Sequence, residues 1–334
     1  MQGGAVFTVG LGSYAVASNT SPAAPALVDL LTAGEPLICL TSRGRLEASR
    51  TLAKSMGGAE ANVAVGLARL GLLTAYVSRV GADPFGDEIV RTLRGEGVDV
   101  SCITRSHQRP TGVMVKELRS PEDVRVHYYR QGSAVTELDG VGDVPRARHV
   151  HMTGITLALG AGPAAAVHDL LSAAHAMGAT ASFDPNIRLK LWSLEEAVGA
   201  IRPLLASVDD LLLSEAEALA ITGARDLDGA LDDLAHGGPS RVVVRRGGAG
   251  ALGVAGEERV EVAAAPAGPL VDCVGAGDAF TAGYLFERLR DGSFEAAMQT
   301  GAWAAGHVVA HAGDFEGLPD RADYDNRAGP VIDR

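Results

Sequence analysis

Two glycines and two aspartates lie together just before a predicted helix, in the segment Asp272-Cys273-Val274-Gly275-Ala276-Gly277-Asp278. Gly275 and Gly277 allow backbone N–H groups to approach an anion closely, and a helix N-terminus adds partial positive charge. Asp278 would repel a bound phosphate, so its position is best explained if it takes a proton from an attacking hydroxyl. The loop Gly275-Ala276-Gly277 with Asp278 therefore predicts phosphoryl transfer to an alcohol. A tight turn followed by an aspartate that the helix dipole favours is the structural alternative.

A second pair of glycines, Gly57 and Gly58, precedes another predicted helix that ends at Gly71. Asn62 falls in the first turn of this helix, where its amide can both donate to and accept from the hydroxyls of a polyol. Gly58 would let such a ligand lie against the backbone. Taken alone, Asn62 could equally be a helix cap.

Together, the two segments resemble the ribokinase-like (PfkB) family of carbohydrate kinases, which carry Gly-Gly-x-x-x-Asn near the start and Asp-x-x-Gly-Ala-Gly-Asp near the end. The resemblance extends from about Leu31 to about Pro319 and includes Asp184-Pro185-Asn186 and Gly313-Asp314. It implies a three-layer α/β/α fold with a mostly parallel central sheet and a small β-sheet lid. It also implies ATP as phosphoryl donor, Mg²⁺ as cofactor and Asp278 as the catalytic base.

Within this family, three segments are similar to those of kinases that act on 2-keto-3-deoxygluconate. They are Thr32–Leu37 with Gly34, the run Tyr128–Ala134, and Asp184–Arg188 followed by Leu191-Trp192. Arg130 and Arg188 could bind the carboxylate of such a sugar acid through forked, charge-assisted hydrogen bonds, which a neutral hexose would not require. The resemblance implies substrate contacts from Gly34, Gly57, Gly58, Asn62, Tyr128, Arg130, Arg188 and Asp278, with the 6-phosphate as product.

The nucleotide contacts follow from the resemblance by position. Ser214 stands where many members have Asn, and Glu217 would orient hydrated Mg²⁺ rather than bind it directly. Arg245, with Gly247 and Gly250, corresponds to a Lys-x-Gly segment that contacts phosphate and ribose. Trp303 replaces an Asn near the adenine and could stack on the base.

Other substrates and one other class of function stay open. Fructokinase, 2-keto-3-deoxygalactonate kinase and 5-dehydro-2-deoxygluconokinase belong to the same family, and Met114 stands where some relatives have Tyr. A sugar-binding regulator without turnover is favoured by Trp303 and Ser214, whereas Asp278 and the two loop glycines argue against it.

Composition limits the partners that we expect. The chain has 334 residues and a net charge of −12, which argues against general affinity for nucleic acid or an anionic membrane. Its three cysteines show no metal-ligand spacing and are typical of a reduced, cytoplasmic protein. We find no apolar run near the roughly 18 residues needed to span a bilayer. The expected partners are a small sugar acid and ATP.

Alternating strand and helix patterns predict a mostly parallel sheet covered on both faces. The expected strands are 30–32, 74–80, 149–153, 179–183, 210–213 and 242–245, and the expected helices are 60–70, 84–96, 163–176 and 193–206. Residues 37–56 and 111–130 show short alternating stretches that predict antiparallel strands, which the resemblance assigns to the lid. We expect residues 1–26 to be an N-terminal extension and 27–330 the kinase domain, and assembly into homodimers or larger homo-oligomers through the lid stays open.

Overall fold

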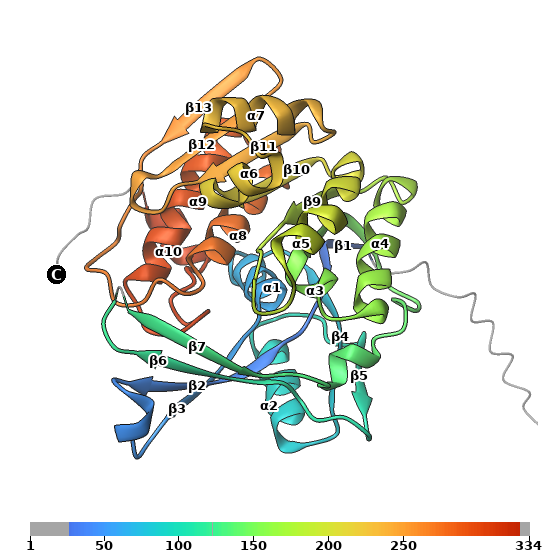
Figure 1. The fold of residues 1–334 in the computed structure, drawn as a ribbon, viewed down its shortest axis with the longest axis vertical. Coiled ribbons are helices and arrows are strands. Elements are labelled where there is room, and N and C mark those ends of the chain that lie inside the picture. Colours follow the sequence, from blue (N-terminus) through green and yellow to red (C-terminus); the bar gives the residue numbers. More distant parts are fainter. Residues whose placement is uncertain (1–26, 122, 328–334) are drawn as a thin grey trace, which may run out of the picture.

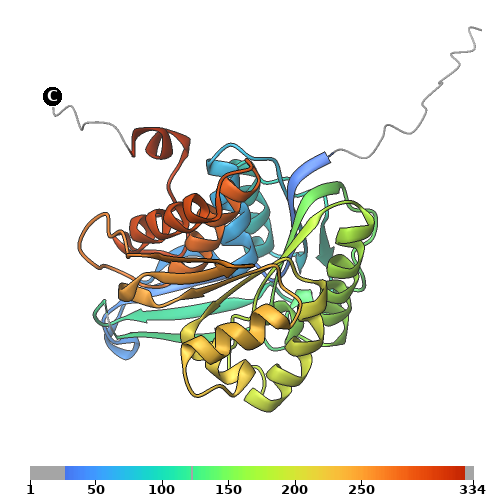
Figure 2. The ribbon, with the colours of Figure 1, turned by 90° about the horizontal axis from the view of Figure 1, so that it is seen from above.

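A computed structural model describes residues 27–121 and 123–327. The proposed extension, residues 1–26, lies outside the described residues. The described chain forms a large sheet between two layers of helices, with a smaller sheet beneath one edge (Figures 1 and 2).

The large sheet has nine strands within the described residues, in the order β13-β12-β11-β10-β9-β8-β1-β4-β5. From β11 through to β5 in this spatial order, neighbouring strands pair in parallel, whereas β12 and β13 form an antiparallel edge next to β11. Their bounds are β1 Leu27–Ala33, β4 Thr74–Gly81, β5 Ile103–Ser106, β8 Arg146–Thr153, β9 Thr180–Asp184, β10 Asp210–Ser214, β11 Arg241–Arg245, β12 Ala251–Ala255 and β13 Glu258–Val262. All six expected strands are confirmed.

Successive residues of the central strands enter opposite hydrophobic cores, because side chains alternate along a strand. Leu211 and Leu213 of β10 join one core and Leu212 the other. Leu31 lies opposite Ala75 on β4 and Val150 on β8, and all of them belong to the first core. These strands are apolar on both faces, as expected for a parallel sheet covered on both sides.

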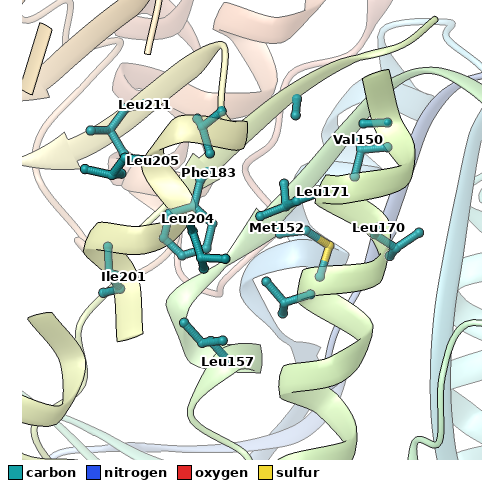
Figure 3. Packing of buried hydrophobic residues seen from close by; sticks show 14 of the residues in the cluster. Val150, Met152, Leu157, Leu170, Leu171, Phe183, Ile201, Leu204, Leu205 and Leu211 are labelled. Carbon is teal, nitrogen blue, oxygen red and sulfur yellow. The ribbon is translucent and has the colours of Figure 1, made fainter. Parts of the chain in front are cut away.

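Two layers of helices cover the sheet. The first core packs beneath α3 Gly154–Leu157, α4 Ala161–Ala176, α5 Leu194–Ile201, α6 Glu215–Thr222 and α7 Leu227–His236. Figure 3 shows part of this core, with labelled side chains from α3, α4 and α5. The second packs beneath α1 Ala59–Arg69, α2 Pro84–Gly95, α8 Ala276–Arg288 and α9 Phe294–Val309, and α10 Arg321–Asn326 follows near the C-terminus. Among the described residues, no helix combines the length and apolar character that crossing a bilayer requires.

One helix prediction was too long. A single helix was expected over 193–206, but α5 ends at Ile201 and a 3-10 helix, Arg202–Ser207, follows. Pro203 lacks the N–H needed to continue the α-helical hydrogen bonds, and its ring clashes with the preceding turn. The predicted start is confirmed, since Ser193 and Glu196 form a capping box.

The small sheet forms the lid, with strand order β3-β2-β6-β7. Its strands are β2 Leu37–Arg43, β3 Ala53–Gly57, β6 Val113–Leu118 and β7 Val124–Tyr129. The outer pairs are antiparallel as expected, but β2 and β6 run parallel. The chain returns to the large sheet between β3 and β6, so the two central strands are not joined by a hairpin and need not be antiparallel.

Candidate active site

A cavity of about 1260 Å³ lies between the lid and the carboxyl ends of the parallel strands. Glu35, Asp184, Ser214 and Arg245, which follow or end β1, β9, β10 and β11, all line it. Ligand sites in open α/β sheets form at this edge, where the loops of neighbouring strands diverge. The cavity is large enough for two small molecules together.

The loop predicted to bind phosphate lies at one end of the cavity. Gly275 caps α8 with a φ of 83°, and a side chain there would collide with the carbonyl oxygen of Asp314. Ala276, Gly277 and Asp278 form the first turn of α8, whose N–H groups have no acceptor within the helix. The turn therefore offers donors and partial positive charge to an anion.

Asp278 lies in this turn and faces the cavity. Asn62 donates from Nδ2 to Asp278 Oδ2 over 2.7 Å, which joins the two motifs found in the sequence. Burial and the nearby Asp184 raise the pKa of Asp278 to about 7, against the lowering effects of Asn62, Arg188 and Arg245. A carboxyl with this pKa can accept a proton near neutral pH, as a general base must.

Asn62 and Asn186 each bury an amide oxygen that has no hydrogen-bond partner among the described residues. Both residues line the cavity. A buried acceptor without a donor is costly, so both oxygens suit the hydroxyl groups of a ligand. Asn186 holds its position with a φ of 39°, a left-handed conformation that Asn tolerates better than most residues.

The end of the cavity that the sequence assigns to the sugar contains several cations. Arg130 lines it but is buried and paired with Glu35, whose other oxygen accepts from Ser133. Arg188 is exposed at the cavity and makes no ion pair or side-chain hydrogen bond with any described residue. Lys190 lines the same region and donates to the carbonyl of Val126 on β7 over 2.6 Å.

Tyr128 lines the cavity from β7, whereas its neighbour Tyr129 is 67% exposed. Gly58 also lines the cavity, with a φ of 141° that other residues rarely adopt. Gly34 and Gly57, predicted as substrate contacts, do not. A side chain at Gly34 would collide with the carboxyl of Glu60, and one at Gly57 would meet Met114 and Asp314. Both glycines allow close packing beside the site, which the motif alone could not distinguish from ligand contact.

Ser214, Glu217, Gly247, Gly250 and Arg245 all line the cavity, as predicted for the nucleotide half. Glu217 caps its own helix: Oε2 accepts from Ser214 and Oε1 accepts from the backbone N–H of Ile187 over 2.7 Å. Arg245 pairs with Asp184 at 2.9 Å and donates to the carbonyl of Gly277 at 2.9 Å. Its guanidinium thus supports the phosphate loop from behind.

Trp303, expected near the adenine, does not line the cavity. Its ring packs against Tyr324 and His307, with Arg327 over one face. Trp303 projects from a different side of α9 than the residues that reach the cavity, and the sequence match gave no side-chain direction. The lining at this end is apolar and comprises Ala264, Ala265, Pro266, Gly268, Leu270, Ala302, Ala305, Gly306 and Val309.

The sequence did not single out Lys116, and it gave Asp184 and Asp314 no role in the site although both lie in matched segments; all three line the cavity. Asp184 holds Arg245, and Lys116 is fully buried between two aspartates. Their role depends on pairing between distant segments, so the only sequence signals were the Asp184-Pro185-Asn186 and Gly313-Asp314 matches, and Lys116 gave none. Within residues 27–121 and 123–327, no cluster of three or more metal-ligating side chains occurs.

Similarity to known proteins extends over most of the chain. The sequence profile described as pfkB family carbohydrate kinase matches residues 31–321. The chain is 35% identical to the 2-dehydro-3-deoxygluconokinase of Bacillus subtilis, over 88% of this chain and 93% of that protein. It is 33% identical to the 2-dehydro-3-deoxygalactonokinase of Haloferax volcanii, over 92% of this chain and 99% of that protein. The 2-dehydro-3-deoxy and 2-keto-3-deoxy names denote the same sugar acids.

Solved structures agree in fold. A PfkB protein from Polaromonas has a TM-score of 0.80 at 33% identity, covering 89% of this chain and 99% of that one. An aminoimidazole riboside kinase from Salmonella enterica, solved with aminoimidazole riboside and an ATP analogue, has a TM-score of 0.79 at 25% identity, covering 89% and 99%.

Proposed function

Because the chain belongs to the pfkB family of carbohydrate kinases, we propose that its acceptor is 2-keto-3-deoxygluconate, phosphorylated on the primary hydroxyl at C6 with ATP as donor. The observation that carries this choice is the charge at the sugar end of the cavity. Arg188 and Lys190 line it without a carboxylate partner, whereas the other lining cations, Lys116, Arg130 and Arg245, are each paired with an acid. Unpaired cations favour an acceptor that carries a carboxylate.

In the proposed reaction, Asp278 accepts the proton of the C6 hydroxyl as the oxygen attacks the γ-phosphorus of ATP, and ADP leaves. Asn62 holds Asp278 Oδ2 at 2.7 Å and thereby fixes the orientation of the base. The N–H groups of Gly277 and Asp278 stabilise the charge on the phosphoryl group as it is transferred. Closure of the lid over the sugar would keep water from competing as the acceptor.

Mg²⁺ is expected to arrive with ATP, since this ion commonly binds through substrate phosphates and few protein ligands. When bound, it would neutralise charge on the phosphates. The absence of a metal-ligating cluster among the described residues fits that mode. Glu217 already accepts from backbone N–H groups with both oxygens, so we assign it to orienting water on the ion.

A second candidate is the galactonate epimer, 2-keto-3-deoxygalactonate. Both acids carry the same carboxylate, so the cations at Arg188 and Lys190 would bind either. The relative from Haloferax volcanii, named for the galactonate, matches over nearly the whole of both chains. Discrimination between the two rests on hydroxyl contacts around Asn62 and Asn186.

A coupled assay of ADP release tests the proposal. MgATP would be combined in turn with 2-keto-3-deoxygluconate, 2-keto-3-deoxygalactonate, gluconate, fructose and ribose. We expect the highest kcat/KM for 2-keto-3-deoxygluconate. A higher value for 2-keto-3-deoxygalactonate would make that epimer the acceptor instead. A higher value for fructose or ribose would refute the role of the cations. No turnover with any acceptor would favour a sugar-binding regulator.

A further inference from the structure

Lys116 is a fully buried lysine on lid strand β6. Its Nζ lies 2.7 Å from Asp272 Oδ2 and 2.7 Å from Asp314 Oδ1, and the Lys116 side chain is 0% exposed. Lysines are almost never buried this completely unless they are paired. Both partners belong to segments far from the lid in sequence, so the ammonium joins the lid to the body of the protein.

The two aspartates hold opposite sides of the phosphate loop. Asp272 begins the loop and accepts from the backbone N–H of Val274 over 3.1 Å. The backbone carbonyl of Asp314 packs against Gly275, which caps α8 and has no room for a side chain. Asp272 also accepts from Gly313 over 3.4 Å, which links the two segments directly.

Electrostatics make the ammonium necessary to this arrangement. Asp272 is 0% exposed and Asp314 is 3% exposed. Two buried carboxylates this close repel each other unless a cation lies between them. In the part of the chain that the structure describes, Lys116 is the residue that pairs with both. Loss of its charge would push the two aspartates apart and shift the loop that they hold.

We propose that Lys116 is a positioning residue for phosphoryl transfer. Its ammonium is an internal cation that fixes the loop 272–277 in its anion-binding conformation and couples that conformation to the position of the lid. Lys116 does not contact the transferred phosphoryl group in this proposal, and acts through Asp272 and Asp314. The inference rests on the assignment of Gly275–Gly277 as the phosphate site, and it does not depend on which sugar is the acceptor.

The first test is Lys116→Met, which keeps most of the side-chain volume and removes the charge. We expect kcat to fall about 100-fold, as when reacting groups are displaced by about 1 Å, and the affinity for MgADP to fall as well. The matched control is Lys54→Met: Lys54 also lies on a lid strand, but it is exposed and pairs with Glu88 on α2. The control should keep wild-type values.

Chemical rescue separates positioning from simple loss of stability. Lys116→Ala leaves a space beside two carboxylates that a small ammonium ion can enter. Added methylammonium should raise kcat/KM of this variant at least tenfold and leave kcat/KM of wild type unchanged. The larger tetramethylammonium should raise neither. Circular dichroism would verify folding in each case. Should neither variant fold, Lys116→Met/Asp314→Asn keeps the local net charge unchanged and should fold. It removes the repulsion between the two carboxylates but also the ammonium that joins the lid to the loop, so kcat should still fall, by less than in Lys116→Met, and a wild-type kcat would overturn the proposal.

Turnover within twofold of wild type in folded Lys116→Met would overturn the proposal, as would a folded Lys116→Ala that methylammonium does not rescue. Binding of MgADP, measured by calorimetry, is independent of the acceptor. If wild type bound MgADP but did not phosphorylate 2-keto-3-deoxygluconate, the substrate assignment would fail, while the comparison of MgADP affinity between wild type and Lys116→Met would still decide the role of the lysine.

Discussion

Replacing Asp278 by asparagine should remove the general base and at the same time stabilise the fold above neutral pH. Asparagine has nearly the same shape, and its carbonyl oxygen can still accept from Asn62. The loss of a general base lowers turnover by about two to four orders of magnitude. The gain in stability follows from the raised pKa of the carboxyl.

The magnitude of this gain comes from the pKa of Asp278, which rises from 3.8 to about 7 on folding. A group whose folded-state pKa is raised contributes its full stability below the unfolded pKa and loses it as the pH rises through the folded pKa. Between pH 5 and pH 7 the wild-type protein should lose at most about 2.7 kcal/mol through this one group, at about 1.4 kcal/mol per pH unit. Because Asp278 is partly exposed, about 1 to 2 kcal/mol is the expected range.

Urea unfolding of wild type and Asp278→Asn at pH 5 and pH 8 measures the effect. From pH 5 to pH 8, the free energy of unfolding of the variant should increase relative to that of wild type by about 1 to 2 kcal/mol. The matched control is Asp291→Asn, which removes one carboxylate at an exposed site that does not line the cavity. A stability difference for Asp278→Asn that is the same at both pH values would refute the burial argument, and unchanged turnover would refute the role as base.

Three further predictions concern the two ends of the cavity. Arg188→Ala should raise KM for the sugar acid about tenfold with little change in kcat, whereas an equal loss with a neutral acceptor would contradict carboxylate binding. Trp303→Phe should leave KM for ATP unchanged and lower the free energy of unfolding by about 1 kcal/mol. A raised KM for ATP would instead support the predicted contact between Trp303 and the adenine. The apolar base end lacks side-chain hydrogen-bonding groups, so GTP should replace ATP within about 100-fold in kcat/KM, and complete rejection of GTP would indicate specific contacts from the backbone.

The sequence was sufficient to predict the central sheet because its pattern is local. Within the expected strand 210–213, Leu211–Leu213 are apolar on both faces, which is typical of a strand buried on both sides, and the structure has β10 there. The errors occurred where strand pairing depends on contacts between distant parts of the chain. Nothing near β2 indicates that its partner across the lid would be β6 in parallel, since this pairing depends on how the chain returns from the large sheet.

Site residues within motifs were predicted because glycine, asparagine and aspartate have specific chemistry at a helix start. Asp278 and Asn62 contact each other as two matched motifs would suggest. Which cations face a ligand could not be predicted, because that depends on acids that approach from other elements. Arg245, expected at the nucleotide phosphates, does line the cavity, but its pairing with Asp184 at the end of β9 could not be predicted.

Recognition of an acid and closure of the lid are connected by the residues that remain unpaired. Glu35 neutralises Arg130, so the net positive charge at the sugar end comes from Arg188 and Lys190, which follow β9 in the body of the protein. Lys190 donates to the carbonyl of Val126 and lies over the ring of Tyr128, both on lid strand β7. A carboxylate bound between Arg188 and Lys190 would therefore hold the lid in place through Lys190. A neutral sugar would lack that link, so the selectivity for an acid should be expressed in kcat as well as in KM.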